Sequence, residues 1–142
     1  MKFNVDLLRQ RAGEIRQALY ILENYRRLPK EDFLGNQQAS DAAKSRLIVV
    51  IEASVSICTH LSARLAGQTP ESYAQCFEIL AVSKVIPQEL ADSLGNMARF
   101  RNLLVDGYGR VDDSRVWDIL QQHVSDLGAY LVEISKTLQE KL

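Results

Sequence analysis

Residues 97–117 read MARFRNLLVDGYGRVDDSRVW, and this stretch decides the fold. Its first half carries apolar residues at helical spacing, and Gly107 and Gly109 then interrupt the pattern. Asp112 and Asp113 follow, and acidic residues suit the N-terminus of a new helix. The stretch therefore predicts the end of one helix, a short turn and the start of another. Two helices joined in this way pack antiparallel.

The same helical spacing of apolar residues extends over most of the chain in both directions. Pro29 ends one segment, Gly67 lies just past another, and Thr69 followed by Pro70 is expected to cap a third. A polar connection is expected over residues 30–38. Five helices are predicted, over residues of about 4–28, 41–65, 69–83 and 87–105, and from 112 or 113 towards the C-terminus.

The run LIVVIEASVSI at residues 47–57 is rich in β-branched side chains, yet its length and its lack of a breaker favour a buried helix over a strand. No internal repeat or linker divides the chain. The sequence thus predicts an all-α protein, an antiparallel bundle of four to five helices, in which residues 1–142 form a single domain.

The composition restricts the kinds of ligand that the chain can bind. With 142 residues and a net charge of −1, it has no overall attraction to nucleic acid, so any RNA contact needs a local basic cluster. The first 30 residues carry seven basic and three acidic side chains, which form either a solvated helix face or a strip facing RNA.

Cysteine and histidine give no sign of a metal site. Cys58 and Cys76 lie in apolar helical pattern without a CxxC motif, so buried, reduced thiols are expected. His60 and His123 lack helix-spaced partners, whereas a zinc site needs about four ligands. We also find no apolar run of about 20 residues and no signal-peptide pattern, which favours a cytoplasmic protein that needs no membrane.

Arg101 falls in the middle of an apolar arc. At 100° per residue, the arc is formed by its helical neighbours Leu94, Met97 and Leu104. A guanidinium there is costly unless it is paired or faces a cleft. Either it forms a salt bridge to a neighbouring helix, or it binds phosphate, for which its planar, permanently charged fork is suited.

Asp106 lies about 140° from Arg101 on the same wheel, so the two point apart in a continuous helix. They converge only if the helix stops near Val105 and the chain turns at the glycines. Tyr108 would then lie on an exposed loop. On local grounds alone, Asp106 is equally an ordinary turn residue and Tyr108 a loop residue that covers the bundle end.

The segment Arg101-Asn102-Leu103-Leu104-Val105-Asp106-Gly107-Tyr108 resembles the signature of the HEPN family: Arg, a polar residue, an apolar spacer, His, one residue, Tyr. The flanking segments resemble those of HepT-type toxins in the same order. They are Ile51-Glu52-Ala53, Ser72-Tyr73, Leu94, Met97, Phe100, Val111-Asp112 and Val116-Trp117. The resemblance covers nearly the whole chain, from about Leu19 to Leu131.

The resemblance implies a helical homodimer with a metal-independent, cofactor-free ribonuclease site where the two motifs meet. It also implies a partner, a nucleotidyltransferase antitoxin of the MNT type that neutralises the toxin by transferring AMP to the motif tyrosine. Carried over to this chain, Arg101 would contact the scissile phosphate of the RNA, tRNA or mRNA. Asn102 would assist its positioning, and Tyr108 would accept AMP.

The family's histidine is replaced here by Asp106. Metal-free RNA cleavage needs a base for the 2′-hydroxyl, an acid for the leaving oxygen and a cation for the charged phosphorane. An ordinary aspartate is ionised at pH 7 and can only accept a proton. The sequence therefore predicts slower RNA cleavage than in a relative that carries the histidine, or none.

Three functions stay open on the sequence. The first is a toxin ribonuclease that uses Arg101, Asn102 and Asp106. The second is a HEPN dimer that binds a nucleotide or its nucleotidyltransferase without cleaving RNA. The third is a helical scaffold in which Arg101 only forms a core salt bridge.

Overall fold

The computed structural model describes residues 2–107 and 110–141, and every regular element in that part of the chain is helical. The elements are α1 (Val5–Arg26), α2 (Lys30–Leu34), α3 (Gln37–Leu61), the π-helical turn η1 (Ser62–Ala66), α4 (Tyr73–Val82), α5 (Gln88–Gly107) and α6 (Asp113–Lys141). The predicted all-α class is confirmed, and all five predicted helices are present.

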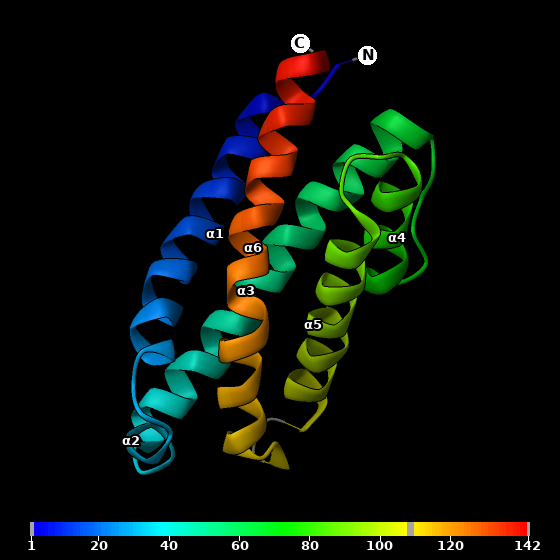
Figure 1. Cartoon of the computed structure of the whole chain (residues 1–142). Coiled ribbons are helices and arrows are strands. Elements are labelled where there is room, and N and C mark those ends of the chain that lie inside the picture. The colour runs from blue at the N-terminus through cyan, green and yellow to red at the C-terminus, as the bar shows by residue number, and fades with distance from the viewer. Residues whose placement is uncertain (1, 108–109, 142) are drawn as a thin grey trace.

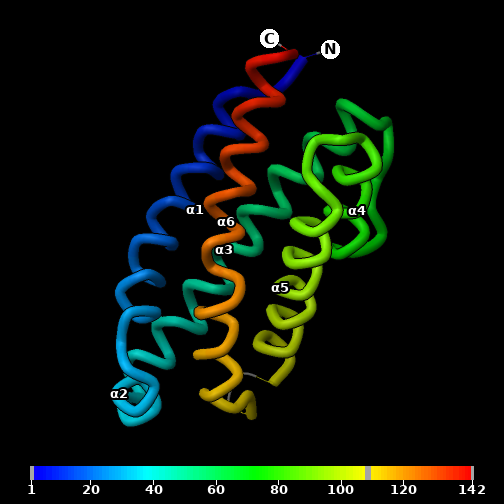
Figure 2. Tube along the Cα trace, in the orientation of Figure 1, coloured from blue at the N-terminus to red at the C-terminus, as the bar shows by residue number. Residues whose placement is uncertain are grey.

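The long helices alternate in direction, as in an antiparallel bundle (Figure 1). α1 packs against α3 and α6, and α5 packs against α4 and α6. α3 crosses the bundle obliquely and contacts every other α-helix (Figure 2). The start of α1 and the end of α6 lie together at one end of the molecule, whereas the α5–α6 connection lies at the other end with α2.

The apolar run in α3 is buried, as predicted from its length. α3 and η1 together are long and apolar enough, by length and composition, to cross a membrane. However, 56% of this apolar window is buried inside the bundle, as in the core helix of a globular protein. Gly67 ends the segment with φ at 62°, the left-handed conformation that favours glycine.

Three local predictions were wrong. Residues 30–38 are not only a connection, because α2 forms there and buries Phe33 against the core. Thr69 is not the cap of α4. Ser72 takes this role, and its hydroxyl accepts a hydrogen bond from the Gln75 backbone N–H at 3.1 Å. Finally, α5 does not stop near Val105 but continues to Gly107.

The start of α6 is held by a cap and by an ion pair to α3. Asp112 caps α6 by accepting the Ser114 backbone N–H at 2.9 Å, which confirms the predicted start of this helix. Asp113, the first helical residue, pairs at 2.9 Å with the Nζ atom of Lys44, a buried side chain of α3. Burial raises the pKa of Asp113, but the nearby Ser40 hydroxyl and the Lys44 ammonium outweigh it and leave the pKa lowered.

Candidate functional site

Arg101 lies on the side of α5 that faces α3 and α4. Its side chain is 18% exposed, and its Nη2 atom donates a hydrogen bond to the Glu52 carboxylate of α3. The guanidinium carbon lies 5.2 Å from the ring centroid of Tyr73, the first residue of α4. The predicted salt bridge to a neighbouring helix is therefore present.

The contacts of Arg101 leave part of its hydrogen-bonding capacity unused. Nη1 donates to Asn102 Oδ1 at 3.3 Å, a long and weak bond. Nε is buried and finds no acceptor among the described residues. A buried N–H without a partner is costly, and a bound ligand that supplies the acceptor would remove this cost. The geometry thus leaves the phosphate-binding alternative open beside the structural one.

Three of the segments that resemble HepT-type toxins contribute residues to the surroundings of the Arg101 guanidinium. Glu52 comes from the Ile-Glu-Ala segment, Tyr73 from the Ser-Tyr segment, and Arg101 with Asn102 from the motif itself. Sequence reasoning gave no role to Glu52 or Tyr73. The only signal for them was their place in those flanking segments, because nothing local indicates which residue of α3 faces α5.

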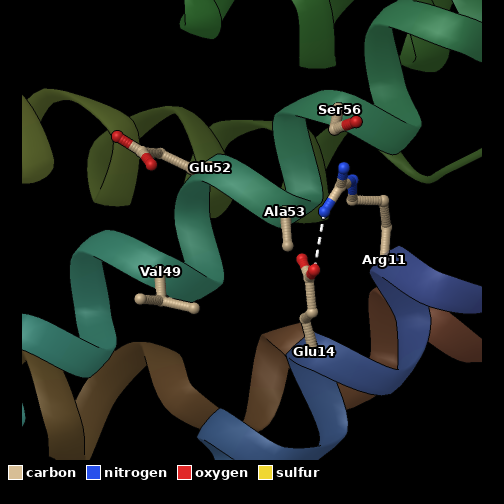
Figure 3. A pocket seen from close by; sticks show the side chains of 6 residues that line it. All are labelled: Arg11, Glu14, Val49, Glu52, Ala53 and Ser56. Atoms are coloured by element: carbon tan, nitrogen blue, oxygen red, sulfur yellow. Dashed lines mark hydrogen bonds and ion pairs between the residues drawn. The ribbon is translucent and has the colours of Figure 1, made fainter.

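Glu52 also borders a hollow of about 420 Å³ that lies between α3 and α1. Arg11 and Glu14 line it and form an ion pair at 2.6 Å. Figure 3 shows that Glu52 points away from this pair, while Val49 and Ser56 line the same stretch of α3. The pair is part-buried, and Arg11 Nε, like Arg101 Nε, finds no acceptor among the described residues.

Asp106 does not join Arg101. Because α5 remains helical through Gly107, the offset of about 140° between the two side chains persists, and the convergence that an early helix end would allow does not occur. Asp106 is exposed and lines a different hollow, of about 350 Å³, with Arg110 and Arg115. Tyr108, the predicted AMP acceptor, lies outside the described residues.

The remaining polar candidates have structural partners. Cys58 and Cys76 are buried and free, as expected, and burial raises the pKa of the Cys58 thiol. His60 Nε2 accepts the Asn4 backbone N–H at 3.0 Å. No cluster of three or more His, Cys, Asp or Glu side chains that could hold a metal occurs within residues 2–107 and 110–141.

The model of the family described as "Ribonuclease HepT-like" matches residues 15–134, which include α2 to α5 in full, with the motif residues Arg101 to Gly107 at the end of α5. The chain belongs to the HepT-like ribonuclease family. The match confirms the resemblance drawn from the motif and its flanking segments. It also places Glu52, Tyr73 and Arg101 inside the part of the chain that defines the family.

Among curated proteins, the chain is similar to the mRNA nuclease HepT of Shewanella oneidensis, with 29% identity over 80 residues. These residues make up 56% of this chain and 60% of that relative, so the aligned part spans less than two thirds of the relative's length.

Solved structures give the same fold. A tri-AMPylated Shewanella oneidensis HEPN toxin in complex with MNT antitoxin superposes with a TM-score of 0.84 at 22% identity, over 96% of this chain and 99% of that one. YutE of Bacillus subtilis, described as a cytosolic protein of unknown function, superposes with a TM-score of 0.87 at 18% identity, over 100% and 96%. At such identities the similarity demonstrates the HEPN fold.

Proposed function

We propose that this HepT-like chain is the toxin of a HEPN/MNT toxin–antitoxin pair, a cytoplasmic, metal-independent ribonuclease that cleaves tRNA or mRNA. The observation that carries the proposal is Arg101, a mostly buried guanidinium with an N–H that finds no acceptor among the described residues. A phosphate oxygen is the acceptor that such a group binds most strongly.

In the proposed reaction, the ribose 2′-oxygen attacks the adjacent phosphorus and the 5′-oxygen of the next nucleotide leaves. A base removes the 2′-hydroxyl proton, an acid protonates the leaving oxygen, and a cation stabilises the extra negative charge of the phosphorane. Arg101 supplies the cation and Asn102 helps to position the phosphate. Asp106 serves as the base, and because an ionised carboxylate carries no proton to donate, water protonates the leaving oxygen.

The site is proposed to require a homodimer. Within one chain Arg101 and Asp106 lie on different sides of α5, so one copy does not hold both groups on one phosphate. Val105 is about half exposed beside the motif, and Val49 is exposed on α3, which offers apolar surface for a second copy. Light scattering of the purified chain should give twice the mass of one chain.

The first test is expression of the chain alone in bacteria under a tightly controlled promoter. Wild type should reduce viable counts, and Arg101→Ala should restore them because the phosphate loses its cation. Arg16→Ala, an exposed arginine of α1, is the matched control and should remain toxic. Equal growth of wild type and Arg101→Ala would contradict the proposal.

The Asp106 substitution makes a separate, graded prediction. Asp106→His restores the imidazole of the family signature, which can serve as acid or base near neutral pH. RNA cleavage by Asp106→His should therefore exceed that of wild type by about 100-fold or more, since general acid catalysis typically contributes about 10²- to 10⁴-fold. If wild type already matches the histidine variant, the missing acid does not limit the reaction.

Neutralisation is proposed to occur by transfer of AMP from ATP to the Tyr108 hydroxyl, with release of pyrophosphate. The new phosphodiester and nucleoside would place negative charge and bulk near the motif arginines and exclude RNA. Co-expression with an MNT-type nucleotidyltransferase should add AMP mass to the Tyr108 peptide, and Tyr108→Phe should abolish the gain at that peptide. An unmodified Tyr108 in a neutralised complex would contradict this step.

A second candidate function is a HEPN dimer that binds a nucleotide or its nucleotidyltransferase without cleaving RNA. The separation of Asp106 from Arg101 favours it, because the chain then lacks an assembled base. This candidate predicts that Asp106→Ala leaves the phenotype of the expressed chain unchanged. The ribonuclease proposal predicts a further loss of cleavage in the same variant.

A further inference from the structure

A second hollow of about 420 Å³ lies between α5 and α6, on the side of α5 that faces away from Arg101. Arg99 and Asn96 project into it from α5. Arg115, Asp118, Gln122 and His123 project into it from α6. The hollow is therefore lined by two guanidinium groups, one imidazole and two carboxamides, against a single carboxylate.

Neither guanidinium is neutralised by a carboxylate in the described part of the chain. Arg99 Nη1 donates to the neutral Asn96 Oδ1 at 2.9 Å. The guanidinium carbon of Arg115 lies 5.7 Å from the ring centroid of Phe100. Asp118 lines the hollow but forms no ion pair with either arginine. The hollow therefore carries an excess of positive charge in a chain whose net charge is −1.

His123 is held in a fixed orientation at this hollow. The Ser93 hydroxyl donates to Asp126 Oδ2, so it can only accept from His123 Nδ1, which lies 2.7 Å away. The imidazole therefore donates from Nδ1, and Nε2, which accepts hydrogen bonds in this tautomer, suits a ribose hydroxyl rather than a phosphate oxygen. A hydrogen bond to one ring nitrogen determines which nitrogen of a histidine carries the proton.

An adjoining hollow indicates where the anion would lie. It shares Phe100, Leu103 and Arg115 with the first and adds Arg110, but its carboxylates, Asp106 and Asp112, balance the arginines. The first hollow, with two arginines against Asp118, therefore carries the excess of positive charge, and Arg99 is the arginine that belongs to it alone. Leu103, which is 55% exposed, gives an apolar surface between the two hollows.

We propose that the hollow formed by Arg99, Arg115 and His123 is a second anion site, which binds backbone phosphates of the RNA outside the cleavage site. The inference rests on the proposed RNA substrate. Two guanidinium groups suit non-bridging phosphate oxygens, and the carboxamides of Asn96 and Gln122 suit ribose hydroxyls. Because the site lies across α5 from Arg101, it holds nucleotides that flank the scissile bond.

The test is fluorescence anisotropy with a short fluorescein-labelled 2′-O-methyl oligouridine, which the chain cannot cleave, measured over a series of salt concentrations. The double variant Arg99→Gln/Arg115→Gln should bind at least about 10-fold more weakly than wild type. Its slope of log affinity against log salt should fall by about 1.4, since each phosphate contact on a single strand contributes about 0.7. His123→Gln should weaken binding to a smaller extent.

Arg9→Gln/Arg16→Gln is the matched control, because it removes the same charge from exposed positions on α1. Affinity and salt slope of this control should equal those of wild type. Loss of binding in the control to the same degree as in the α5–α6 variant would overturn the site and indicate general charge attraction. Unchanged binding by the α5–α6 variant would overturn it as well.

Two further measurements are needed. One distinguishes RNA from free AMP or inorganic phosphate as the ligand, and the other distinguishes the second anion site from the proposed ribonuclease function. AMP or inorganic phosphate should compete with the oligonucleotide only at far higher concentration, and competition at equal concentration would replace RNA by a free nucleotide as the ligand. Arg101→Ala should abolish RNA cleavage but keep the binding that depends on Arg99 and Arg115. If no cleavage is detected in wild type while that binding persists, the proposed function fails and the second site stands.

Discussion

Substitutions in the Glu52–Arg101 pair can show whether Arg101 stabilises the fold or is retained to bind a ligand. The two variants are expected to differ in stability because the two side chains differ in exposure. The Arg101 side chain is 18% exposed and that of Glu52 is 48% exposed. Glu52→Ala leaves a mostly buried guanidinium without its carboxylate. Arg101→Met leaves a half-exposed carboxylate that water solvates, and the methionine stem can still pack on the Tyr73 ring.

The magnitudes follow from these exposures. Exposed ion pairs contribute about 0.2–1 kcal/mol, whereas removing one partner of a fully buried pair costs about 3–5 kcal/mol. Because the Glu52–Arg101 pair lies between these two cases in exposure, we expect Glu52→Ala to lower the free energy of unfolding by about 1.5 kcal/mol. Arg101→Met removes a buried, unsatisfied Nε and should change stability by no more than about 0.5 kcal/mol, or increase it.

The assay is thermal and urea unfolding followed by circular dichroism. A chain of 142 residues has an unfolding entropy near 0.3 kcal/mol/K, so Glu52→Ala should lower Tm by about 5 °C. Glu133→Ala is the control, because Glu133 pairs with the exposed Lys136 on one face of α6, and its Tm should change by less than about 2 °C.

One result would refute the reasoning. If Arg101→Met destabilises the fold as much as Glu52→Ala does, the guanidinium is a structural group, and its retention in the sequence needs no ligand. If Arg101→Met is neutral or stabilising, the charge is retained at a cost to the fold, as expected for a group whose role is to bind.

Three further predictions concern the scaffold. Tyr130→Phe should lower Tm by about 3–4 °C, because the buried hydroxyl donates to the Ser54 carbonyl at 2.8 Å and such a bond contributes about 1 kcal/mol. Gly67→Ala should cost about 1 kcal/mol in urea unfolding through its backbone alone, since φ is 62° and an added Cβ meets nothing within 4 Å. The pKa of Asp113 is lowered in the fold, so its contribution to stability is complete above about pH 4 and is lost as the pH falls through that lowered pKa. Asp113→Asn should therefore be less stable than wild type at pH 7, and the two unfolding free energies should converge in acid.

Each scaffold prediction has its own contrary outcome. An unchanged Tm for Tyr130→Phe would mean that the hydroxyl contributes nothing net. A stabilised Gly67→Ala would mean that the segment ends in another conformation. A constant difference between Asp113→Asn and wild type across the pH range would mean that the carboxylate charge is not what stabilises the start of α6.

The sequence alone predicted the long helices because each depends on local signals. The spacing of apolar residues located α1, α3, α5 and α6, and Gly67 marked a helix end that needs a positive φ. It did not predict α2, which has five residues and one buried side chain, Phe33. A helix this short is stabilised by packing against its neighbours rather than by its own propensity.

The site was predicted only in part for a related reason. Helical spacing placed Arg101 on a buried face, but the identity of its partner depends on how α3 packs against α5, which no local pattern determines. Thr69 and Ser72 are both good caps, and the extended backbone of Ser72, with φ at −147°, selects the second. His123 was set aside for lack of a metal partner, whereas its partners are Ser93, on another helix, and Asp126.

The arrangement of the chain ends has a practical consequence for studies in living cells. The start of α1 and the end of α6 share one end of the bundle, and the end of α5 and the start of α6 lie at the other (Figure 1). A fluorescent protein or affinity handle fused at either end is thereby kept away from the end of the bundle where α5 ends and α6 begins. Because those two ends are neighbours, a short linker could also join them, and new ends could be opened in an exposed connection such as the one that follows Gly67.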